Sequence, residues 1–164
     1  MKSFILVLSS LFVATCATNV PVLPAVAAEH PEARLFDPEP SQSAIESVEV
    51  ALVEAKDKGR HAMIVMGANW CHDSRALAGW FETPRFAALL EQNFIVRYID
   101  VGQKDKNIDV AQGFGLDDIV GTPTVIITDS HGEVLNLETA PTWRNAASRS
   151  ENSIFEYFET FAPK

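Results

Sequence analysis

The stretch that decides the fold reads AMIVM at residues 62–66 and GANWCHDS at residues 67–74. The first five residues form a continuous apolar run between two glycines, and such a short run is typical of a strand buried on both faces. A helical stretch follows and continues through Phe81. The sequence therefore predicts a buried strand that leads directly into a helix, with Cys71 at the junction.

Further helices and strands are expected on both sides of this junction. Apolar periodicity predicts helices at residues 43–58, 83–93, 108–114 and 154–161, and β-branched or apolar runs predict strands at residues 94–99, 124–128 and 133–137. Two strands joined by a helical crossover run parallel, whereas two strands joined by a tight turn form an antiparallel hairpin. The order predicts an α/β fold with a mixed sheet of four or five strands and helices on both faces.

The N-terminus has the pattern of an export signal. Lys2 is followed by an apolar run at residues 4–14 and by small residues at 25–28. This order of charge, apolar run and small residues is typical of a secretory signal peptide, and the apolar run is short for a membrane span. We expect residues 1–28 to be a signal peptide that directs the protein to the periplasm or the exterior of a bacterial cell.

A second possibility for this segment is a lipoprotein signal, in which Cys16 becomes the lipidated N-terminus. Thr15 is unusual directly before such a cysteine, so simple export is favoured. Residues 29–42 contain three prolines and indicate an extended leader. Residues 43–164 are expected to form the folded domain, and none of its segments is long and apolar enough to span a membrane.

The charge of the chain excludes some partners. The formal net charge is −9 at pH 7. An acidic protein has no electrostatic reason to bind nucleic acid or anionic lipid. There is no glycine-rich phosphate-binding loop either, and no cofactor is expected.

The cysteine count points to a single thiol. The chain has two cysteines, Cys16 and Cys71. If Cys16 leaves with the signal, Cys71 has no partner for an internal disulfide, so it is either buried and inert or free to react with another molecule. The first turn of a helix favours the thiolate, which is the nucleophile. A protonated His72 would strengthen this effect and Asp73 would oppose it.

A second motif, VGTPT at residues 120–124, opens a β-branched strand. A proline at the start of a strand cannot donate to the ladder of hydrogen bonds. If the Thr122–Pro123 bond is cis, the backbone of Thr122 is left exposed and can hold an extended peptide by strand-like hydrogen bonds. The alternative is an ordinary trans proline at a strand start.

Together the two motifs resemble the thioredoxin superfamily, over roughly residues 43–162. Within it the chain is similar to exported bacterial thioredoxin-like proteins, for example the C-terminal domain of the disulfide reductase DsbD. The resemblance implies that Cys71 is the attacking cysteine and Trp70 the aromatic residue that precedes it. It also implies that Pro123 is the cis-proline and Thr122 the residue whose backbone meets the substrate.

Two departures from that family change the expected chemistry. Ser74 stands where the resolving cysteine belongs, and Val65 stands where thioredoxin carries a buried acid. Both changes remove the resolving step. We expect monothiol exchange by Cys71 with protein or glutathione thiols and disulfides, which gives isomerisation or deglutathionylation. Ser74 would stabilise the thiolate by a hydrogen bond, and His72 would border the substrate.

Two other hypotheses remain beside this one. The missing resolving cysteine also suits a non-catalytic thioredoxin-like module that binds peptides or a partner protein. Cys71 and His72, with His61 or His131, are candidate copper or zinc ligands. Adjacent residues rarely bind one metal ion well and the usual spaced ligand pairs are missing, so no metal site is expected.

Overall fold

The structure, a computed structural model, describes residues 30–36, 38 and 43–164. The α-helices are α1 (Ala44–Lys58), α2 (His72–Phe81), α3 (Pro84–Asn93), α4 (Ile108–Gly113) and α5 (Glu151–Thr160), the strands are β1 (His61–Gly67), β2 (Phe94–Asp100) and β3 (Thr124–Thr128), and two 3-10 turns are η1 (Ala140–Trp143) and η2 (Ala146–Ser148). The predicted signal peptide, the lipid site at Cys16 and part of the predicted leader lie outside the described residues.

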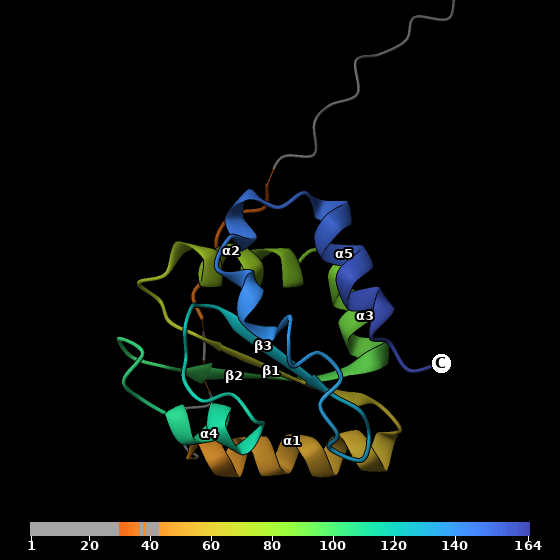
Figure 1. The fold of residues 1–164 in the computed structure, drawn as a ribbon. Helices are drawn as coiled ribbons and strands as arrows, with labels where there is room; N and C mark the ends of the chain where they lie inside the picture. The colour runs from red at the N-terminus through yellow and green to blue at the C-terminus, as the bar shows by residue number, and fades with distance from the viewer. Residues whose placement is uncertain (1–29, 37, 39–42) are drawn as a thin grey trace, which may run out of the picture.

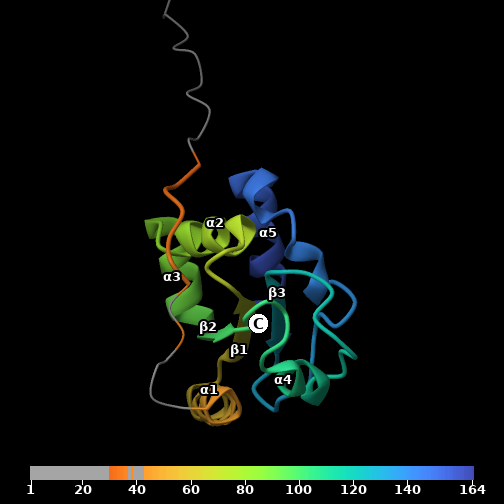
Figure 2. The ribbon, with the colours of Figure 1, turned by 90° about the vertical axis from the view of Figure 1, so that its left-hand side faces the viewer.

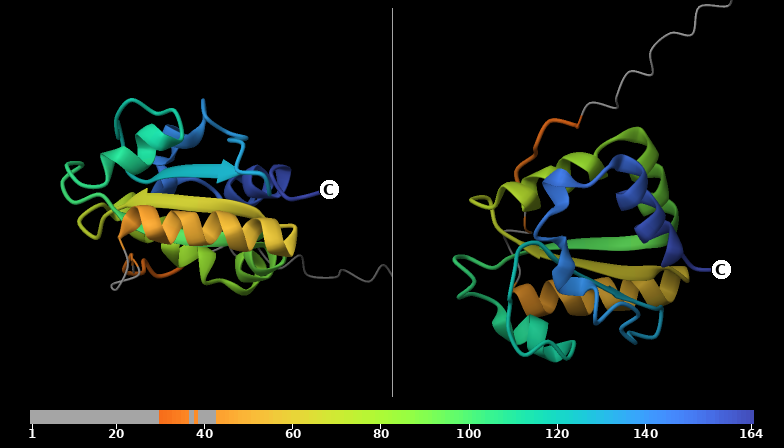
Figure 3. Two further views of the ribbon diagram at one scale, coloured as in Figure 1. Left: turned by 90° about the horizontal axis from the view of Figure 1, so that it is seen from below. Right: turned by 45° about the horizontal axis from the view of Figure 1, so that its top comes forward.

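The three strands form one mixed sheet in the order β2-β1-β3. β1 runs parallel to β2, with His61 beside Phe94, and antiparallel to β3, with Val65 beside Val125. Helices α1 and α4 lie on one face, and α2, α3 and α5 lie on the other (Figures 1 and 3). The predicted mixed sheet with helices on both faces is confirmed.

The expected number of strands was too high: within the described residues the sheet has three strands rather than four or five. The predicted strand at 133–137 is reduced to one isolated bridge between Thr128 and Val134. The buried side chain of Asn136 explains why, because its amide oxygen accepts from the Ile127 N–H and its amide nitrogen donates to the Val125 carbonyl, both at 2.8 Å. The edge of β3 is thus satisfied partly by this side chain and partly by the backbone, since the Leu135 N–H donates to the Ile127 carbonyl at 2.8 Å.

Helix ends follow from local sequence signals. Ser43 caps α1 and forms a reciprocal capping box with Glu46, which satisfies backbone N–H groups that the first turn leaves unpaired. Gly59 ends this helix with φ 62°, a left-handed conformation that glycine adopts at little cost. The Ser150 side chain accepts from the Ser153 N–H and so caps α5.

The sheet separates two apolar layers. Met63 and Val65 of β1 point to the side of α2, α3 and α5, where the packing is rich in aromatic rings. Ile64 and Met66 point to the side of α1 and α4. All four side chains are fully buried, so β1 is the centre of the molecule and positions whatever follows it. None of the helices in the described ranges is long and apolar enough to span a bilayer.

Residues 30–36 of the leader are packed along α2 (Figure 2). The Arg34 N–H donates to the Arg75 carbonyl at 3.0 Å. A Cβ atom on Gly79 would collide with the carbonyl of Glu32, so this helix position needs glycine. The segment ends in Phe36, whose buried ring meets Tyr98 edge-on at 4.9 Å between centroids. The leader therefore contributes to the core.

Candidate active site

Cys71 lies where β1 passes into α2, as the sequence predicted. It occupies the N-cap position of α2. Its N–H donates to the Ala68 carbonyl at 3.0 Å and its carbonyl accepts from the Arg75 N–H at 3.2 Å. The residue is 8% exposed and is the free cysteine of the described chain. The sulfur is therefore held in a fixed position just beneath the surface.

The second motif meets Cys71 through the backbone of Thr122. The Cys71 thiol donates to the Thr122 carbonyl oxygen, with Sγ and O 3.3 Å apart, across 51 positions of sequence. The Thr122–Pro123 peptide bond is cis, but Thr122 is only 5% exposed, so the expectation that its backbone would be exposed was wrong. Only the protonated thiol can donate this hydrogen bond, so loss of the proton breaks it. The thiolate then has no bond to Thr122 and is available to another atom.

Ser74 lies in the first turn of α2 and is 1% exposed. Its hydroxyl oxygen accepts from the Ala68 N–H at 3.4 Å. It also fills the space above Gly67, where an added Cβ would lie 2.6 Å from the Ser74 oxygen. In the part of the chain that the structure describes, no hydrogen bond joins Ser74 to Cys71. The Ser74 hydroxyl is thus fixed on the loop that leads into Cys71.

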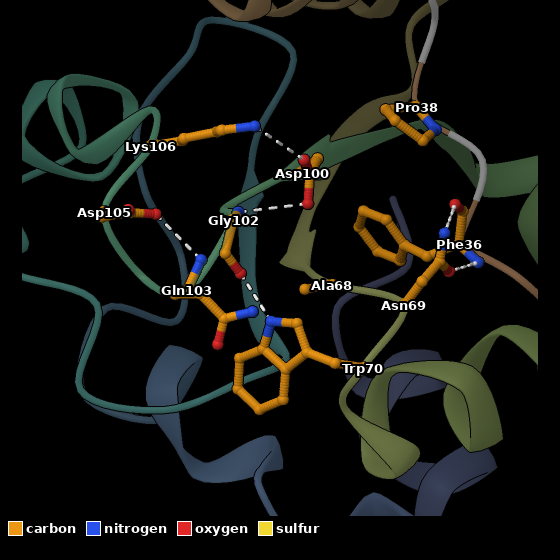
Figure 4. A pocket seen from close by; sticks show the side chains of 10 residues that line it. All are labelled: Phe36, Pro38, Ala68, Asn69, Trp70, Asp100, Gly102, Gln103, Asp105 and Lys106. Carbon is orange, nitrogen blue, oxygen red and sulfur yellow. Dashed lines mark hydrogen bonds and ion pairs between the residues drawn. The ribbon is translucent and has the colours of Figure 1, made fainter.

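Trp70 borders the site on the other side and is 50% exposed. Its indole N–H donates to the Gly102 carbonyl, 2.6 Å from nitrogen to oxygen. The Gly102 N–H in turn donates to the Asp100 carboxylate at 3.1 Å. Figure 4 shows these bonds at the edge of a cavity of about 430 Å³ that Phe36 and Lys106 also line. The exposed indole is therefore anchored by its nitrogen while its ring stays accessible.

His72 and Asp73 begin α2 and point to different surroundings. The His72 side chain is 71% exposed, with Nδ1 3.7 Å from an Asp73 carboxylate oxygen. The other Asp73 oxygen accepts from the Ala147 N–H at 2.8 Å. Asp73 thereby ties η2 to the helix that carries Cys71. Sequence reasoning missed this tether because the two residues are 74 positions apart.

The candidate metal ligands do not gather at Cys71. His61 begins β1, whereas Cys71 follows the end of that strand, and seven strand residues span about 20 Å. The His61 ring nitrogen Nδ1 lies 2.8 Å from the Phe161 carbonyl oxygen. His131 lies in the turn after β3. The described residues contain no group of three potential metal ligands among His, Cys, Asp and Glu.

Comparisons with known proteins agree with this geometry. The Thioredoxin-like family model matches residues 43–130. A solved disulphide isomerase from Xylella fastidiosa Temecula1 is 32% identical, covers 74% of this chain and 93% of its own, and superposes with a TM-score of 0.68. A weaker likeness, with 18% identity and a TM-score of 0.49, is to the C-terminal domain of DsbD from Neisseria meningitidis, over 79% of this chain and 99% of that domain.

The search of curated proteins gives no match. The family model nevertheless covers more than half of the chain, and the site has the thioredoxin arrangement of a cysteine at a helix start beside a Thr-Pro turn. The chain therefore belongs to the Thioredoxin-like family and has the thioredoxin fold.

Proposed function

We propose that this protein carries out thiol–disulfide exchange with one thiol, Cys71. The single observation that carries the proposal is the 3.3 Å contact between the Cys71 sulfur and the Thr122 carbonyl, since it places a lone thiol beside a backbone edge. The family membership and the disulphide isomerase among the similar structures support a thiol–disulfide oxidoreductase-like function. The monothiol character follows from Ser74, which stands where a second thiol would be required.

The proposed cycle has two exchange steps. The Cys71 thiolate attacks one sulfur of a substrate disulfide, a new S–S bond forms to Cys71, and the other substrate sulfur leaves as a thiolate. A second thiolate, from the substrate or from glutathione, then attacks the mixed disulfide and releases Cys71. One disulfide is consumed and one is formed, so the cycle isomerises or transfers a disulfide without net oxidation.

The residues around the sulfur have separate roles in this proposal. The main chain of Thr122, set by Pro123, lies against the backbone next to the substrate disulfide. Trp70 and His72 border the substrate on the exposed side. The Ser74 hydroxyl cannot attack a disulfide, so the mixed disulfide persists until an external thiol arrives. We assign Ser74 the further role of donating its O–H toward the Cys71 thiolate.

We also propose that exchange takes place in the bacterial cell envelope. The expected signal peptide at residues 1–28 supports this location, and an envelope compartment contains protein disulfides to exchange. The leader at 29–42 and the domain at 43–164 would form the mature protein. Soluble export is favoured over a lipid anchor at Cys16, and cleavage before residue 29 or at Cys16 separates the two in an N-terminal analysis of the exported protein.

A second candidate function is a non-catalytic module that binds peptides or a partner protein. The low exposure of Cys71 and its bond to Thr122 favour this reading, because a covered thiol reacts slowly. The same backbone edge would then bind an extended segment without covalent chemistry.

The test compares the mature protein with Cys71→Ala and with Ser74→Cys in glutathione-dependent reduction of a glutathionylated peptide. We expect Cys71→Ala to lose the accelerated rate, at least a hundredfold, because no other thiol remains in the mature chain. We expect Ser74→Cys to gain dithiol reduction that the wild type lacks. Equal rates for wild type and Cys71→Ala would reject catalysis and leave the binding module.

A further inference from the structure

The segment between β3 and α5 places the side chain of Arg144 next to Gly121, the residue that precedes Thr122. The η1 turn packs against β3, and η2 packs against α2 (Figure 1). Arg144 lies between the two turns, and its aliphatic stem covers Gly121: an added Cβ there would lie 3.2 Å from Arg144 Cδ and 3.3 Å from Arg144 Cβ. Gly121 directly precedes Thr122, whose carbonyl bonds to the Cys71 thiol.

The position of this segment is fixed from the side of α2 as well. Asp73, two residues after Cys71, accepts from the Ala147 N–H at 2.8 Å, and its side chain is 13% exposed. The fully buried Trp143 stacks on Phe158, with ring centroids 4.7 Å apart and planes 12° apart. The residue before Arg144 is therefore anchored in the core, and the residue three positions after it is tied to the active-site helix.

The two arginines of this segment are used differently. The Arg149 guanidinium lies 4.1 Å from the Trp143 ring centroid and donates to the Thr142 carbonyl, and burial lowers its pKa from the ordinary arginine value. Arg144 is exposed, and among the described residues no carboxylate lies within 4.0 Å of it and no hydrogen bond engages its guanidinium. A guanidinium that no carboxylate of the described chain engages is a ready partner for the carboxylate of a ligand.

From this placement we infer that Arg144 is a specificity-determining residue: it favours substrates that carry a carboxylate close to the disulfide, as a glutathionyl group does. The inference rests on the proposed use of Cys71 and adds a substrate class to it. Attack by Cys71 on oxidised glutathione forms a glutathionyl–Cys71 disulfide and releases glutathione thiolate. Arg144 takes no part in the bond changes and acts by attracting and orienting the carboxylate.

The first test uses two alkylating reagents that differ only in a carboxylate. The Cys71 thiolate displaces iodide from iodoacetate, which is anionic, and from iodoacetamide, which is neutral. We compare the ratio of the two rates in wild type and in Arg144→Met, which keeps most of the stem and removes the charge. The matched control is Arg60→Met, which removes the same charge before β1, about 20 Å from the site at the other end of that strand.

We expect Arg144→Met to lower the iodoacetate-to-iodoacetamide ratio about three- to fivefold at low salt, the size of an exposed ion pair, and 1 M salt to remove most of the difference. Arg60→Met should leave the ratio unchanged. An unchanged ratio in Arg144→Met, or equal slowing with both reagents, would overturn the inference, because the second result would mean that Arg144 only supports the fold.

Disulfide probes then separate this inference from the proposed function. Oxidised glutathione should react more slowly with Arg144→Met than with wild type, whereas neutral hydroxyethyl disulfide should react at the same rate. We also compare the reaction rates of a peptide disulfide whose cysteine is flanked by glutamate and of the same peptide with glutamine instead. A faster reaction of the glutamate peptide with wild type would mean that any neighbouring carboxylate is enough for recognition by Arg144, whereas equal rates would limit recognition to the glutathionyl group. Alkylation of Cys71 without reaction toward any disulfide would reject exchange itself, and disulfide exchange indifferent to Arg144 would reject only the selectivity.

Discussion

The two walls beside Cys71 differ in how they are built. The Trp70 wall consists of an exposed indole hydrogen-bonded to Gly102, beside a cavity that Phe36 from the leader helps to line. The Thr122 wall consists of buried backbone in direct contact with the sulfur. The aliphatic stem of Arg144 packs against Gly121, the residue before Thr122. Under the proposed function, we expect the chemistry of the sulfur to depend on the Thr122 wall and the Trp70 wall to contribute shape and stability.

The largest effect that tests this contrast comes from Phe36→Ala. Removing a fully buried aromatic side chain leaves a cavity, and we expect the free energy of unfolding to fall by about 3–5 kcal/mol in a urea titration. Since the contact between Cys71 and Thr122 does not involve Phe36, the folded variant should react with hydroxyethyl disulfide at the wild-type rate.

Leu35→Ala is the matched control for this loss, because Leu35 precedes Phe36 in the same leader but is 71% exposed. It should change the stability by no more than about 0.5 kcal/mol. A Phe36→Ala protein as stable as wild type would show that the leader is not part of the core. A folded Phe36→Ala protein with altered disulfide chemistry would break the division between the two walls.

A smaller effect is expected on the stability of the protein at alkaline pH, through Tyr98, whose ring contacts Phe36. Burial, and secondarily the charge of Glu82, raises the pKa of Tyr98 from 10.0 to about 12. The folded protein therefore keeps the Tyr98 proton that the unfolded chain loses, so this contribution to stability is complete below pH 10 and is lost as the pH rises to about 12. Two pKa units correspond to about 2–3 kcal/mol.

The measurement for Tyr98 is the free energy of unfolding against pH between 9 and 12. Tyr98→Phe should make the decline shallower, and Phe36→Ala should move the Tyr98 pKa back toward its ordinary value, because the Phe36 ring covers the phenol ring. If the free energy of unfolding of Tyr98→Phe fell just as steeply with pH, the loss of stability at alkaline pH would come from other titrating groups.

The sequence was sufficient where local signals determine the structure. The apolar run before Cys71 predicted β1, and the position of Cys71 at the start of α2 followed from it. At residues 120–124 the local pattern predicted the start of β3 but left open whether the Thr122–Pro123 bond is cis or trans, and only the family resemblance implied the cis form. Periodicity and turn chemistry act over a few residues, so these elements could be read directly.

The features that could not be predicted depend on side chains that meet from distant positions. Asn136 replaces a fourth strand by bonding its amide to β3, and the sequence signal for a hairpin gave no sign of it. Asn69 holds the backbone of Phe36 through both ends of its amide, at 2.6 and 3.1 Å. The hydrogen bond from the Ala147 N–H to Asp73 and the packing of the Arg144 stem against Gly121 also join residues that are far apart in the sequence. No periodic pattern marks such pairs.

Monothiol exchange by Cys71 can be tested by the intact mass of the mature protein after brief mixing with oxidised glutathione and removal of the reagent. Wild type should carry one glutathionyl group that persists until a thiol is added, since Ser74 cannot release it. Ser74→Cys should release it without added thiol and retain an internal disulfide, and Cys71→Ala should carry none. Wild-type protein that stays unmodified, or that loses the group as fast as Ser74→Cys, would contradict the monothiol account.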